Sequence, residues 1–442
     1  MVARSTLAAS AAAMVLVAGL SACAAPPLLP PGETYGANPR MAEPHRNLLT
    51  PTVNIAPRVG WPEGVMPTPA QGFRVQAFAS GLDHPRWLYR LPNGDILVAE
   101  SNAPPKPDDK KGGIRGWVMG LVMKRAGAGV ESPNKIVLLR DADGDGVAEV
   151  KTDFLTNLTS PFGMALVGDR LFVANADAVV AFPYQTGATQ ITAAPTTIAA
   201  LPAGRNHHWT KSLVASADGT RLYVGVGSNS NVGENGMEEE VGRAAVHEID
   251  IATGQSRIYA SGLRNPVGMA WQPDSQKLWV AVNERDELGN DLVPDYMTSV
   301  TPGAFYGWPY SYFGQHVDSR IQPQDPAKVA SAISPDYALG AHTASLGLTF
   351  YEGSLFPATF SHGAFVGQHG SWNREPKAGY KVIFVPFTNG VPSGAPMDFL
   401  TGFLNERGEA MGRPVGVQAD RTGALLVADD VGNVIWRVSP AA

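Results

Sequence analysis

The sequence is almost free of cysteine, and this absence limits how the fold can be held together. Its 442 residues contain a single cysteine, Cys23. A disulfide bond within the chain and a C-x-x-C-H haem attachment motif are both excluded. The stability of the fold must therefore come from packing.

Long runs of positive charge are also missing. Lys and Arg number 34 against 40 Asp and Glu, which gives a formal net charge of −6, and the positive residues are scattered along the chain. Because binding to nucleic acid depends on clustered positive charge, we expect no nucleic-acid partner.

After residue 70 the sequence has few stretches with the periodicity of an amphipathic helix. Helix bundles and doubly wound folds need such stretches of about ten residues or more, so both classes are excluded. With 48 Gly and 36 Pro, the chain is instead typical of short β-strands separated by turns.

The first 23 residues have the organisation of a secretory signal. Arg4 precedes an apolar stretch at 7–20, which is too short and too rich in Ala for a comfortable membrane-spanning helix. The letters "LSAC" at 20–23 resemble the lipobox of bacterial lipoproteins. This resemblance implies a lipidated Cys23 and a periplasmic or outer-membrane-anchored lipoprotein that contacts the membrane by its lipid only. A plain secretory signal with an incidental cysteine is the alternative.

Residues 24–70 follow with many prolines and no apolar periodicity, which is typical of a tether. Residues 71–442 remain for the folded domain.

One sequence unit recurs six times in this domain. A polar residue, often followed by Pro, leads into an apolar run, a turn and a second apolar run. The copies lie at 82–101, 158–177, 207–227, 263–283, 343–368 and 412–430. Six such hairpins predict an all-β, six-bladed β-propeller. In a propeller the innermost strand of each blade lines a central channel, and the residues just before it crowd one mouth of that channel.

Alignment of the units places polar side chains at equivalent positions before these strands. His208 in "RNHHWTKSL" falls at the position of Arg264 in "GLRNPVGMAW", and Arg413 falls opposite Asn265. We expect the four side chains to converge, an arrangement that suits an anionic ligand and a proton-transfer step. For each residue taken alone, a solvated loop position is the alternative.

Two loops carry further candidates. "GQHGSWNREPKAGYKV" at 367–382 contains His369 and Arg374 and can fold over the same mouth. "VNERDELGNDLVPDY" at 282–296 contains Asp286 and Glu287 and is rich in oxygen ligands of the kind that calcium prefers. An exposed acidic loop is an equally good interpretation of the second motif.

A separate motif, "RDADGDGVAEVKTD" at 140–153, resembles the first half of an EF-hand calcium loop. Thr152 stands where the twelfth-position glutamate is expected, although Glu149 or Asp153 could substitute. A tight Asp-Gly hairpin turn is the alternative. The predicted calcium ligands are Asp141, Asp143 and Asp145.

Together with "YGWPYSYFG" at 306–314, these motifs resemble the sorbosone dehydrogenase group, which is related to soluble quinoprotein glucose dehydrogenase and fungal pyranose dehydrogenase. The resemblance runs from about residue 70 to the C-terminus. It implies a six-bladed propeller that binds pyrroloquinoline quinone (PQQ) and calcium. It also implies oxidation of a sugar or a sugar-derived aldehyde, with transfer of electrons to an acceptor that the sequence does not identify.

The resemblance also assigns roles to residues. His208 matches the catalytic histidine that takes the proton from the substrate hydroxyl, and Arg264 matches the arginine that polarises the quinone carbonyl. The positions implied to contact PQQ are Asn265, His369, Arg374 and Arg413. The backbone carbonyls of Asp286 and Glu287 are implied to hold the active-site calcium, although soluble glucose dehydrogenase has Gly and Pro there. The segment 159–166 offers no counterpart to the glutamine that the glucose enzyme places over the cofactor.

Two other functions are compatible with a propeller. A calcium-dependent lactone hydrolase needs a metal held by carboxylate side chains in the channel. A non-enzymatic propeller that binds partners at the cell surface needs no catalytic His208. The insert at 310–342, which we expect to shape the pocket, carries no readable motif.

Overall fold

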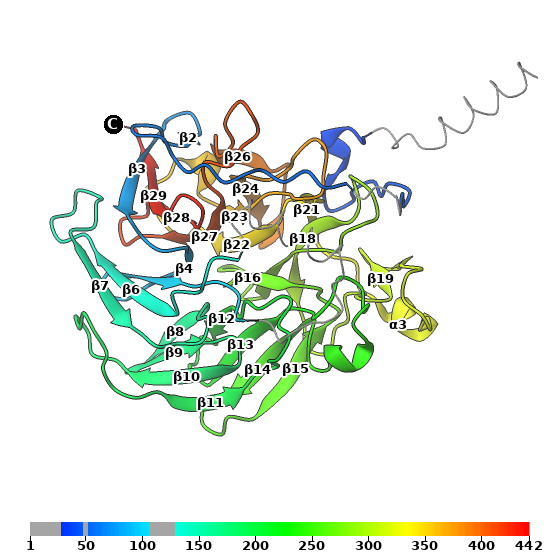
Figure 1. Cartoon of the computed structure of the whole chain (residues 1–442), viewed down its shortest axis with the longest axis horizontal. Helices are drawn as coiled ribbons and strands as arrows, with labels where there is room; N and C mark the ends of the chain where they lie inside the picture. Colours follow the sequence, from blue (N-terminus) through cyan, green and yellow to red (C-terminus); the bar gives the residue numbers. More distant parts are fainter. Residues whose placement is uncertain (1–27, 47–51, 106–128, 442) are drawn as a thin grey trace, which may run out of the picture.

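The computed structural model describes residues 28–46, 52–105 and 129–441, and its architecture is the all-β, six-bladed propeller that the repeats predict (Figure 1). Six antiparallel sheets, blades 1 to 6 in chain order, stand around a central axis. The predicted signal segment, with Cys23, lies outside the described residues. None of the helices in the described ranges is long and apolar enough to cross a membrane.

In every blade the chain runs from an inner strand outwards. Blade 1 contains β4 (Pro85–Arg90), β5 (Ile96–Glu100), β6 (Lys135–Arg140) and β7 (Val150–Leu155). Blade 2 contains β8 (Met164–Val167), β9 (Arg170–Ala174), β10 (Ala178–Pro183) and β11 (Thr196–Ala200). Blade 3 contains β12 (Leu213–Ala215), β13 (Arg221–Val226), β14 (Ala245–Asp250) and β15 (Ser256–Ser261).

The last three blades include strands from the N-terminal part of the chain. Blade 4 contains β16 (Pro266–Trp271), β17 (Leu278–Val282), β18 (Pro294–Val300), β21 (Tyr337–Ala341) and β1 (Tyr35–Gly36). Blade 5 contains β22 (Ser345–Phe350), β23 (Gly363–Gln368), β24 (Lys381–Thr388), β25 (Val391–Pro392), β26 (Met397–Thr401) and β2 (Thr68–Pro69). Blade 6 contains β27 (Pro414–Ala419), β28 (Leu425–Asp429), β29 (Val434–Pro440) and β3 (Phe73–Ser80).

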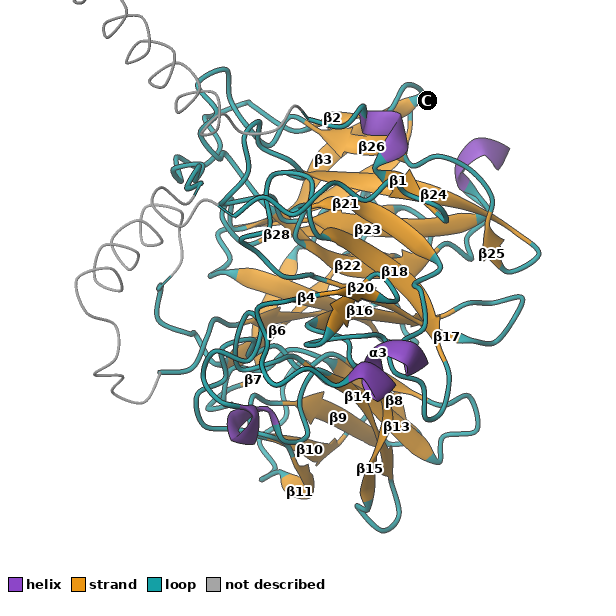
Figure 2. Ribbon diagram, turned by 90° about the vertical axis from the view of Figure 1, so that its right-hand side faces the viewer, coloured by secondary structure: helices purple, strands orange, loops and turns teal. Residues whose placement is uncertain are grey.

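The remaining elements lie outside the blades (Figure 2). Between β18 and β21 the chain forms an insert, residues 301–336, that contains a short hairpin and one helical turn and a half. These elements are β19 (Ser311–Tyr312), β20 (His316–Val317) and α3 (Pro326–Ser331). Elsewhere in the chain lie the 3-10 helices η1 (Pro31–Glu33), η2 (Met237–Glu240) and η3 (Ala358–Phe360).

The six sequence units coincide with the inner two strands of the six blades. The unit at 263–283, for example, contains β16 and β17, and the unit at 412–430 contains β27 and β28. Because every blade has the same strand order, all inner strands begin on one face of the propeller. We call this face, formed by the residues just before β4, β8, β12, β16, β22 and β27, the entry face.

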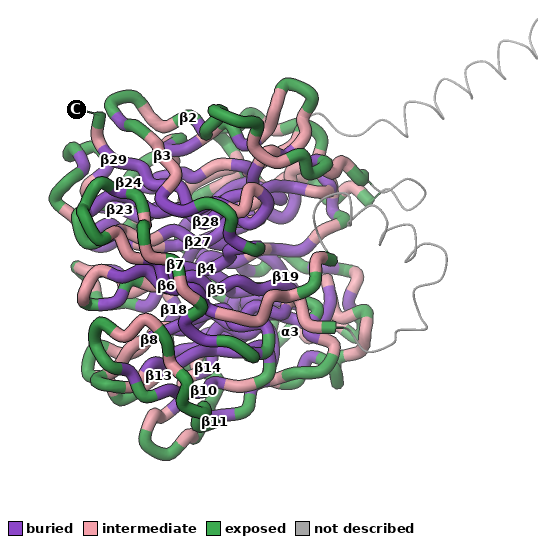
Figure 3. Tube along the Cα trace, turned by 60° about the vertical axis from the view of Figure 1, so that its left-hand side comes forward, coloured by how far each residue is buried: buried purple, intermediate pink, exposed green. Residues whose placement is uncertain are grey.

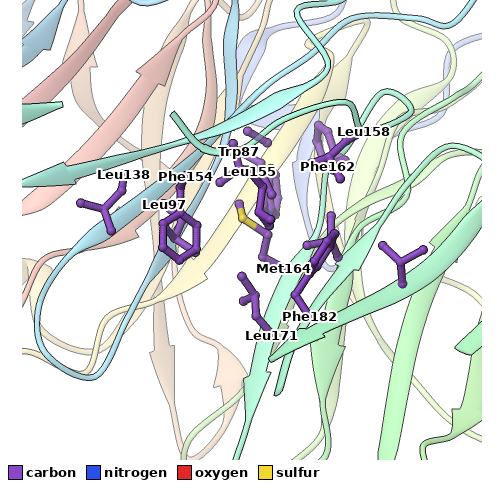
Figure 4. Close-up of a cluster of buried hydrophobic side chains, with 14 of the residues drawn as sticks. Trp87, Leu97, Leu138, Phe154, Leu155, Leu158, Phe162, Met164, Leu171 and Phe182 are labelled. Atoms are coloured by element: carbon purple, nitrogen blue, oxygen red, sulfur yellow. The ribbon is translucent and has the colours of Figure 1, made fainter. Parts of the chain in front are cut away.

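The apolar core is divided among the blade interfaces. Six clusters of buried apolar side chains occur in the described chain, one between each pair of neighbouring blades. In β5, Leu97 and Ala99 face blade 2, whereas Ile96 and Val98 face blade 6. Alternate side chains of a strand point to opposite faces, so the second strand of a blade, which packs against both neighbouring blades, is apolar over most of its length. Figure 3 shows the buried residues concentrated in the strands, and Figure 4 shows the cluster between blades 1 and 2.

An N-terminal strand closes the ring. β3 pairs antiparallel with β29, from Phe73 opposite Pro440 to Ser80 opposite Val434, so the first and last parts of the propeller lie side by side (Figure 1). This pairing holds blade 6 against blade 1 and protects an edge of blade 6 that would otherwise be open.

The described part of segment 24–70 packs on the propeller, which corrects the expectation of a free tether. β1 and β2 extend the outer edges of blades 4 and 5. Ala56 is fully buried, and the indole N–H of Trp61 donates to Asp429 Oδ2 at 2.7 Å. Single anchoring residues such as Ala56 and Trp61 produce no apolar periodicity in the sequence. The composition of the segment therefore suggests a tether although the segment packs on the propeller.

Glycines let the inner strands approach one another closely around the axis. A Cβ on Gly163 would lie 2.2 Å from the backbone nitrogen of Leu213, and one on Gly347 would lie 2.0 Å from the carbonyl oxygen of Val415. Blades 4 and 6 have Gly268 and Gly416 at the same place in the unit, where a Cβ would lie 2.7 and 2.8 Å from backbone atoms of the next blade. The ring of inner strands therefore depends on the absence of side chains at these positions.

We expect Gly347→Ala to destabilise the fold by about 1–3 kcal/mol, because the new methyl group meets backbone that has no room to move. Chemical denaturation measures the effect. Gly32→Ala is the matched control, because no atom lies within 4 Å of its Cβ position. Equal denaturation midpoints for the two variants would contradict the importance of this close approach.

Candidate active site

His208 and Arg264 meet on the entry face. Both are linked to Ser228, the second residue after β13 ends. The N–H of Ser228 donates to the Arg264 carbonyl at 2.8 Å, and the Ser228 carbonyl accepts from the N–H of His208 at 3.2 Å. The structure thus brings together two residues from neighbouring blades, as the alignment of the repeats predicts.

Asn265 lies beside the same two residues. A Cβ on Gly227 would lie 2.5 Å from Asn265 Oδ1 and 2.5 Å from His208 Cβ, so only glycine fits between them. Asn265 is buried, and its Oδ1 has no hydrogen-bond partner within the described residues. An unsatisfied buried acceptor costs about 1–3 kcal/mol, which a ligand donor would relieve.

Hydrogen bonds select one tautomer of His208. Its Nδ1 lies 2.9 Å from the Ser228 carbonyl oxygen and 3.0 Å from Ser228 Oγ, whose own proton goes to the Ser230 carbonyl. A carbonyl only accepts, so Nδ1 carries the proton in the neutral ring. The lone pair is therefore on Nε2, which has no hydrogen-bond partner among the described residues.

Burial and the nearby charge of Arg264 lower the pKa of His208 well below its usual value. His207 acts in the same direction, and its ring packs edge-on against His208 with the centroids 4.7 Å apart. The ring is therefore neutral at neutral pH and has the form that a general base requires.

A buried lysine supports the loop that carries His208. Lys211 Nζ donates to the Trp209 carbonyl at 3.0 Å and to Asn206 Oδ1 at 3.2 Å, and Arg243 donates to the same Oδ1 at 2.9 Å. Burial and the charge of Arg243 lower the pKa of Lys211 well below its usual value. These bonds hold the backbone on both sides of His208.

A second cluster on the entry face surrounds Asp430. Arg86 Nη1 donates to Asp430 Oδ2 at 2.6 Å, and His369 Nε2 lies 3.0 Å from both carboxylate oxygens. His84 Nδ1 lies 3.0 Å from the Asp430 carbonyl. Burial alone would raise the pKa of Asp430, but His369, Arg86 and His84 outweigh it and hold that pKa below its usual range. Burial lowers the pKa of His369 to about 4, so this ring is neutral as well.

Arg86 connects the two clusters, and Arg86 and Arg413 each keep an unused donor. The Arg86 guanidinium lies 5.7 Å from the centre of the Trp209 ring, next to His208, and the Arg413 guanidinium lies 4.9 Å from that of Tyr380. The Nε atoms of Arg86 and Arg413 are buried without a partner among the described residues. Arg413 also makes no salt bridge within the described ranges, so its buried charge is not compensated by a carboxylate there.

Arg264, by contrast, makes hydrogen bonds within the protein through all three of its side-chain nitrogens. It donates to Asn231, to the carbonyls of Asn283 and Glu284, and lies 3.5 Å from Asp286 Oδ2. Arg264 therefore leaves less donor capacity for a ligand than a side chain with an unpaired nitrogen does. The predicted contact to a quinone carbonyl stays a prediction.

The Asp286 side chain is tied into this network rather than turned towards a metal position. Asn373 Nδ2 donates to Asp286 Oδ1 at 2.9 Å, and His342 Nδ1 lies 3.3 Å from the same oxygen. Burial raises the pKa of Asp286, but His342 and Arg264 outweigh burial and lower it. Glu287 follows with an exposed side chain and a left-handed φ of 70°.

The backbone carbonyl of Asp286 does not fit the predicted role of calcium ligand. Arg320 Nη1 donates to this carbonyl at 2.6 Å, and Asn231 Nδ2 donates to it at 3.3 Å. A carbonyl oxygen has two lone pairs, and both are engaged.

Arg374 faces the end of the same loop. Its Nε donates to the Asn290 carbonyl at 2.9 Å, and its Nη2 donates to Asp291 Oδ1 at 2.9 Å. The structure therefore does not group Arg374 with the unused donors of Arg86 and Arg413.

The predicted calcium loop lies on the outer part of blade 1, between β6 and β7. Ligand oxygens of four carboxylates can all lie within 4.8 Å of one another, and three of the four side chains are exposed. The residues are Asp141, Asp143, Asp145 and Glu149. Calcium binding there stays a prediction, and the loop is not part of the entry face.

Sequence patterns do not single out Arg86, Asp430, Lys211 or Arg320. Arg86 follows the proline of the first unit and Asp430 ends the sixth, so the alignment of the units could have placed both on the entry face. Arg320 belongs to the insert without a motif, and only its contacts reveal its position.

The chain is similar in sequence to one known family and to several curated proteins. A sequence model of the TrAA12-like family matches residues 125–303 and 312–441. An uncharacterized protein of Borreliella burgdorferi is 32% identical over 233 residues, which cover 52% of this chain and 60% of that protein. The PQQ-dependent pyranose dehydrogenase of Coprinopsis cinerea is 23% identical over 361 residues, 72% of this chain and 44% of that protein. The chain thus spans about half the length of these relatives.

A solved structure shares the fold. The holo form of the PQQ domain of the Coprinopsis cinerea pyranose dehydrogenase superimposes with a TM-score of 0.69 at 20% sequence identity. The match covers 87% of this chain and 100% of that domain.

We expect Asp430→Asn to destabilise the protein by about 3–5 kcal/mol, because Arg86 would be left buried without its charged partner. Chemical denaturation measures the change. Asp398→Asn is the control: it removes a carboxylate paired with Lys381 at a half-exposed site and should cost no more than about 1 kcal/mol. Similar losses in the two variants would show that the Asp430 cluster has no special importance for the fold.

Proposed function

Because this chain belongs to the TrAA12-like family, we propose that it is a PQQ-dependent dehydrogenase that oxidises a sugar or a sugar-derived aldehyde. One observation carries the proposal: a neutral His208 and the uncompensated guanidinium of Arg413 occupy the same face of the propeller. The relative in Coprinopsis cinerea, a PQQ-dependent pyranose dehydrogenase, supports the choice of cofactor and of substrate class.

The donors on the entry face fit an anionic, planar cofactor such as PQQ. The Nε–H groups of Arg86 and Arg413 can donate charge-assisted hydrogen bonds to its carboxylates. Asn265 Oδ1 can accept from a ligand N–H or from a substrate hydroxyl. An anion would also compensate the buried charge of Arg413, which otherwise costs free energy.

His208 would act as the general base. When bound, PQQ supplies a quinone that accepts a hydride from the substrate carbon. Nε2 of His208 takes the proton from the hydroxyl on that carbon, either of a sugar or of an aldehyde hydrate, so that the carbon becomes a carbonyl. Ser228 holds Nδ1 and thereby the direction of Nε2. A positioned base of this kind contributes about 10²- to 10⁴-fold to the rate.

A calcium-dependent lactone hydrolase needs several carboxylate side chains grouped around one metal position, and the described residues of this face, which include Asp430 and Asp286, contain no such group. In the described chain, the one group of acidic or histidine side chains close enough to share a metal ion is the exposed loop at 141–149. We therefore favour oxidation over hydrolysis.

The test combines two variants of the full chain. We expect His208→Gln to retain PQQ binding, measured by absorption titration, and to lose about 10²- to 10⁴-fold in dye-linked sugar oxidation. We expect Arg413→Gln to weaken PQQ binding by roughly 10- to 100-fold, because a charge-assisted hydrogen bond is lost. His362→Ala, an exposed histidine on the turn between β22 and β23, is the control. If the wild type takes up no PQQ, the proposed function is wrong.

The pH dependence follows from the lowered pKa of His208. Because burial favours the neutral ring, the base stays competent as the pH falls past the ordinary histidine value of about 6.5. We expect the acidic limb of kcat/KM to lie below that value. A limb at or above it, with His208 as the titrating group, would contradict the assignment.

We also propose that residues 1–23 export the protein and that a lipid on Cys23 anchors it, so that oxidation takes place in the periplasm. Cys23→Ala should move the protein from the membrane fraction to the soluble periplasmic fraction in cell fractionation. An unchanged distribution between these fractions would contradict the lipid anchor.

A further inference from the structure

The insert between β18 and β21 places an arginine at the Asp286 carbonyl, one of the two carbonyls where the family resemblance implies a metal ion. Arg320 Nη1 lies 2.6 Å from the Asp286 carbonyl oxygen. Its Nε and Nη2 donate to the two oxygens of Asp318 at 2.9 and 2.7 Å. All three nitrogens of the Arg320 guanidinium thus donate to a protein oxygen, and the side chain is only 5% exposed.

Asp318 is itself fixed from the other side. Arg285 is completely buried, and its Nη1 donates to Asp318 Oδ2 at 3.1 Å. Arg285 also donates to the carbonyls of Pro309 and Ser311, which lie in the insert. Burial raises the pKa of Asp318, but Arg320 and Arg285 outweigh burial and lower it to about 2, so the carboxylate is ionised at any ordinary pH.

The guanidinium and a calcium ion would exclude each other at this carbonyl. Calcium needs its oxygen ligands at about 2.3–2.6 Å, with their lone pairs free. At the Asp286 carbonyl, Arg320 and Asn231 use both lone pairs, and the Arg320 charge would repel a divalent ion at close range. The Asp286 carboxylate offers no substitute, because it faces Arg264 and Asn373.

We propose that the guanidinium of Arg320 takes the place of a calcium ion at the Asp286 carbonyl, so that this chain binds its cofactor without a metal at the loop. The part of this inference that concerns the cofactor rests on the proposed function. The part that concerns calcium does not. The insert then has a definite role: it supplies a fixed positive charge to the loop at 282–296.

The calcium measurement uses the full chain with Asp141→Asn, Asp143→Asn and Asp145→Asn, so that the exposed acidic loop cannot contribute. The protein is stripped with a chelator and dialysed against radioactive calcium in the absence of PQQ. We expect no stoichiometric binding at ~0.1 mM free calcium, a concentration that fills sensor-type sites. One calcium ion per chain at that concentration would overturn the proposal.

Substitution of Arg320 provides a second, independent test of calcium binding. In the same background Arg320→Ala frees the Asp286 carbonyl, and we expect calcium to bind at least tenfold more tightly than in the parent. Arg320→Lys retains a cation and should remain free of calcium. Arg257→Ala, which removes an exposed arginine paired with Glu248, is the matched control. Thermal melting identifies any variant that is not folded. An Arg320→Ala protein that is folded and has the calcium affinity of its parent would overturn the proposal.

Titrations with PQQ distinguish a failure of this inference from a failure of the proposed function. We expect PQQ titrations in excess chelator and in excess calcium to give the same affinity. PQQ binding that requires calcium would overturn the inference and leave the function standing. Absence of PQQ binding under both conditions would overturn the function, whereas the role of Arg320 would still be decided by the calcium measurement.

Discussion

The structure depends on blade strands that are apolar on both faces, such as β5, the second strand of blade 1. Such a strand cannot be stable in an isolated hairpin, because one face would always be open to water. Each blade therefore needs a neighbour on either side, and the series ends only when the last blade meets the first. β3 completes this arrangement by pairing with β29, and the glycines at Gly163, Gly268, Gly347 and Gly416 allow the inner strands to pack at the necessary distance.

Closure of the ring gives the entry face its chemistry. Six strand starts are brought to one end of the axis, and the charged residues at these starts lose most of their contact with water. Most of the resulting arginine charges are compensated within the chain, by Asp430 for Arg86, by Asp286 for Arg264 and by Asp318 for Arg320. Arg413 and Arg243 have no carboxylate partner within the described residues and donate to backbone or amide oxygens instead. The site therefore combines a rigid, neutral histidine with buried cations, Arg413 among them, that have no carboxylate partner within the described residues, a combination that suits the anionic cofactor proposed above.

The same principle distinguishes structural from ligand-binding arginines on this face. Arg264 and Arg320 have protein acceptors for the donors that point into the loop at 282–296, so they hold backbone in place. Arg86 and Arg413 each keep a buried Nε–H without a partner among the described residues, so they have a donor to offer. A residue type at a given place in the repeat does not decide between these roles. What decides whether an arginine is structural or ligand-binding is the number of its N–H donors that have no protein acceptor after folding.

The sequence by itself determined the fold, because propeller blades are local: each unit of about 20 residues contains both of its inner strands and the turn between them. It also determined that His208, Arg264, Asn265 and Arg413 share one face, since equivalent positions in a closed repeat lie at equivalent heights. The relation to PQQ-dependent pyranose dehydrogenases, implied by the motifs, is confirmed by the match to the TrAA12-like family. Only the tertiary structure decided which charges are paired. Arg86 and Asp430 are 344 residues apart and Arg320 and Asp286 are 34 apart, and neither pair belongs to a repeating pattern. Hydrogen bonds form between atoms that folding brings within about 3 Å, and no local property of the sequence encodes that distance.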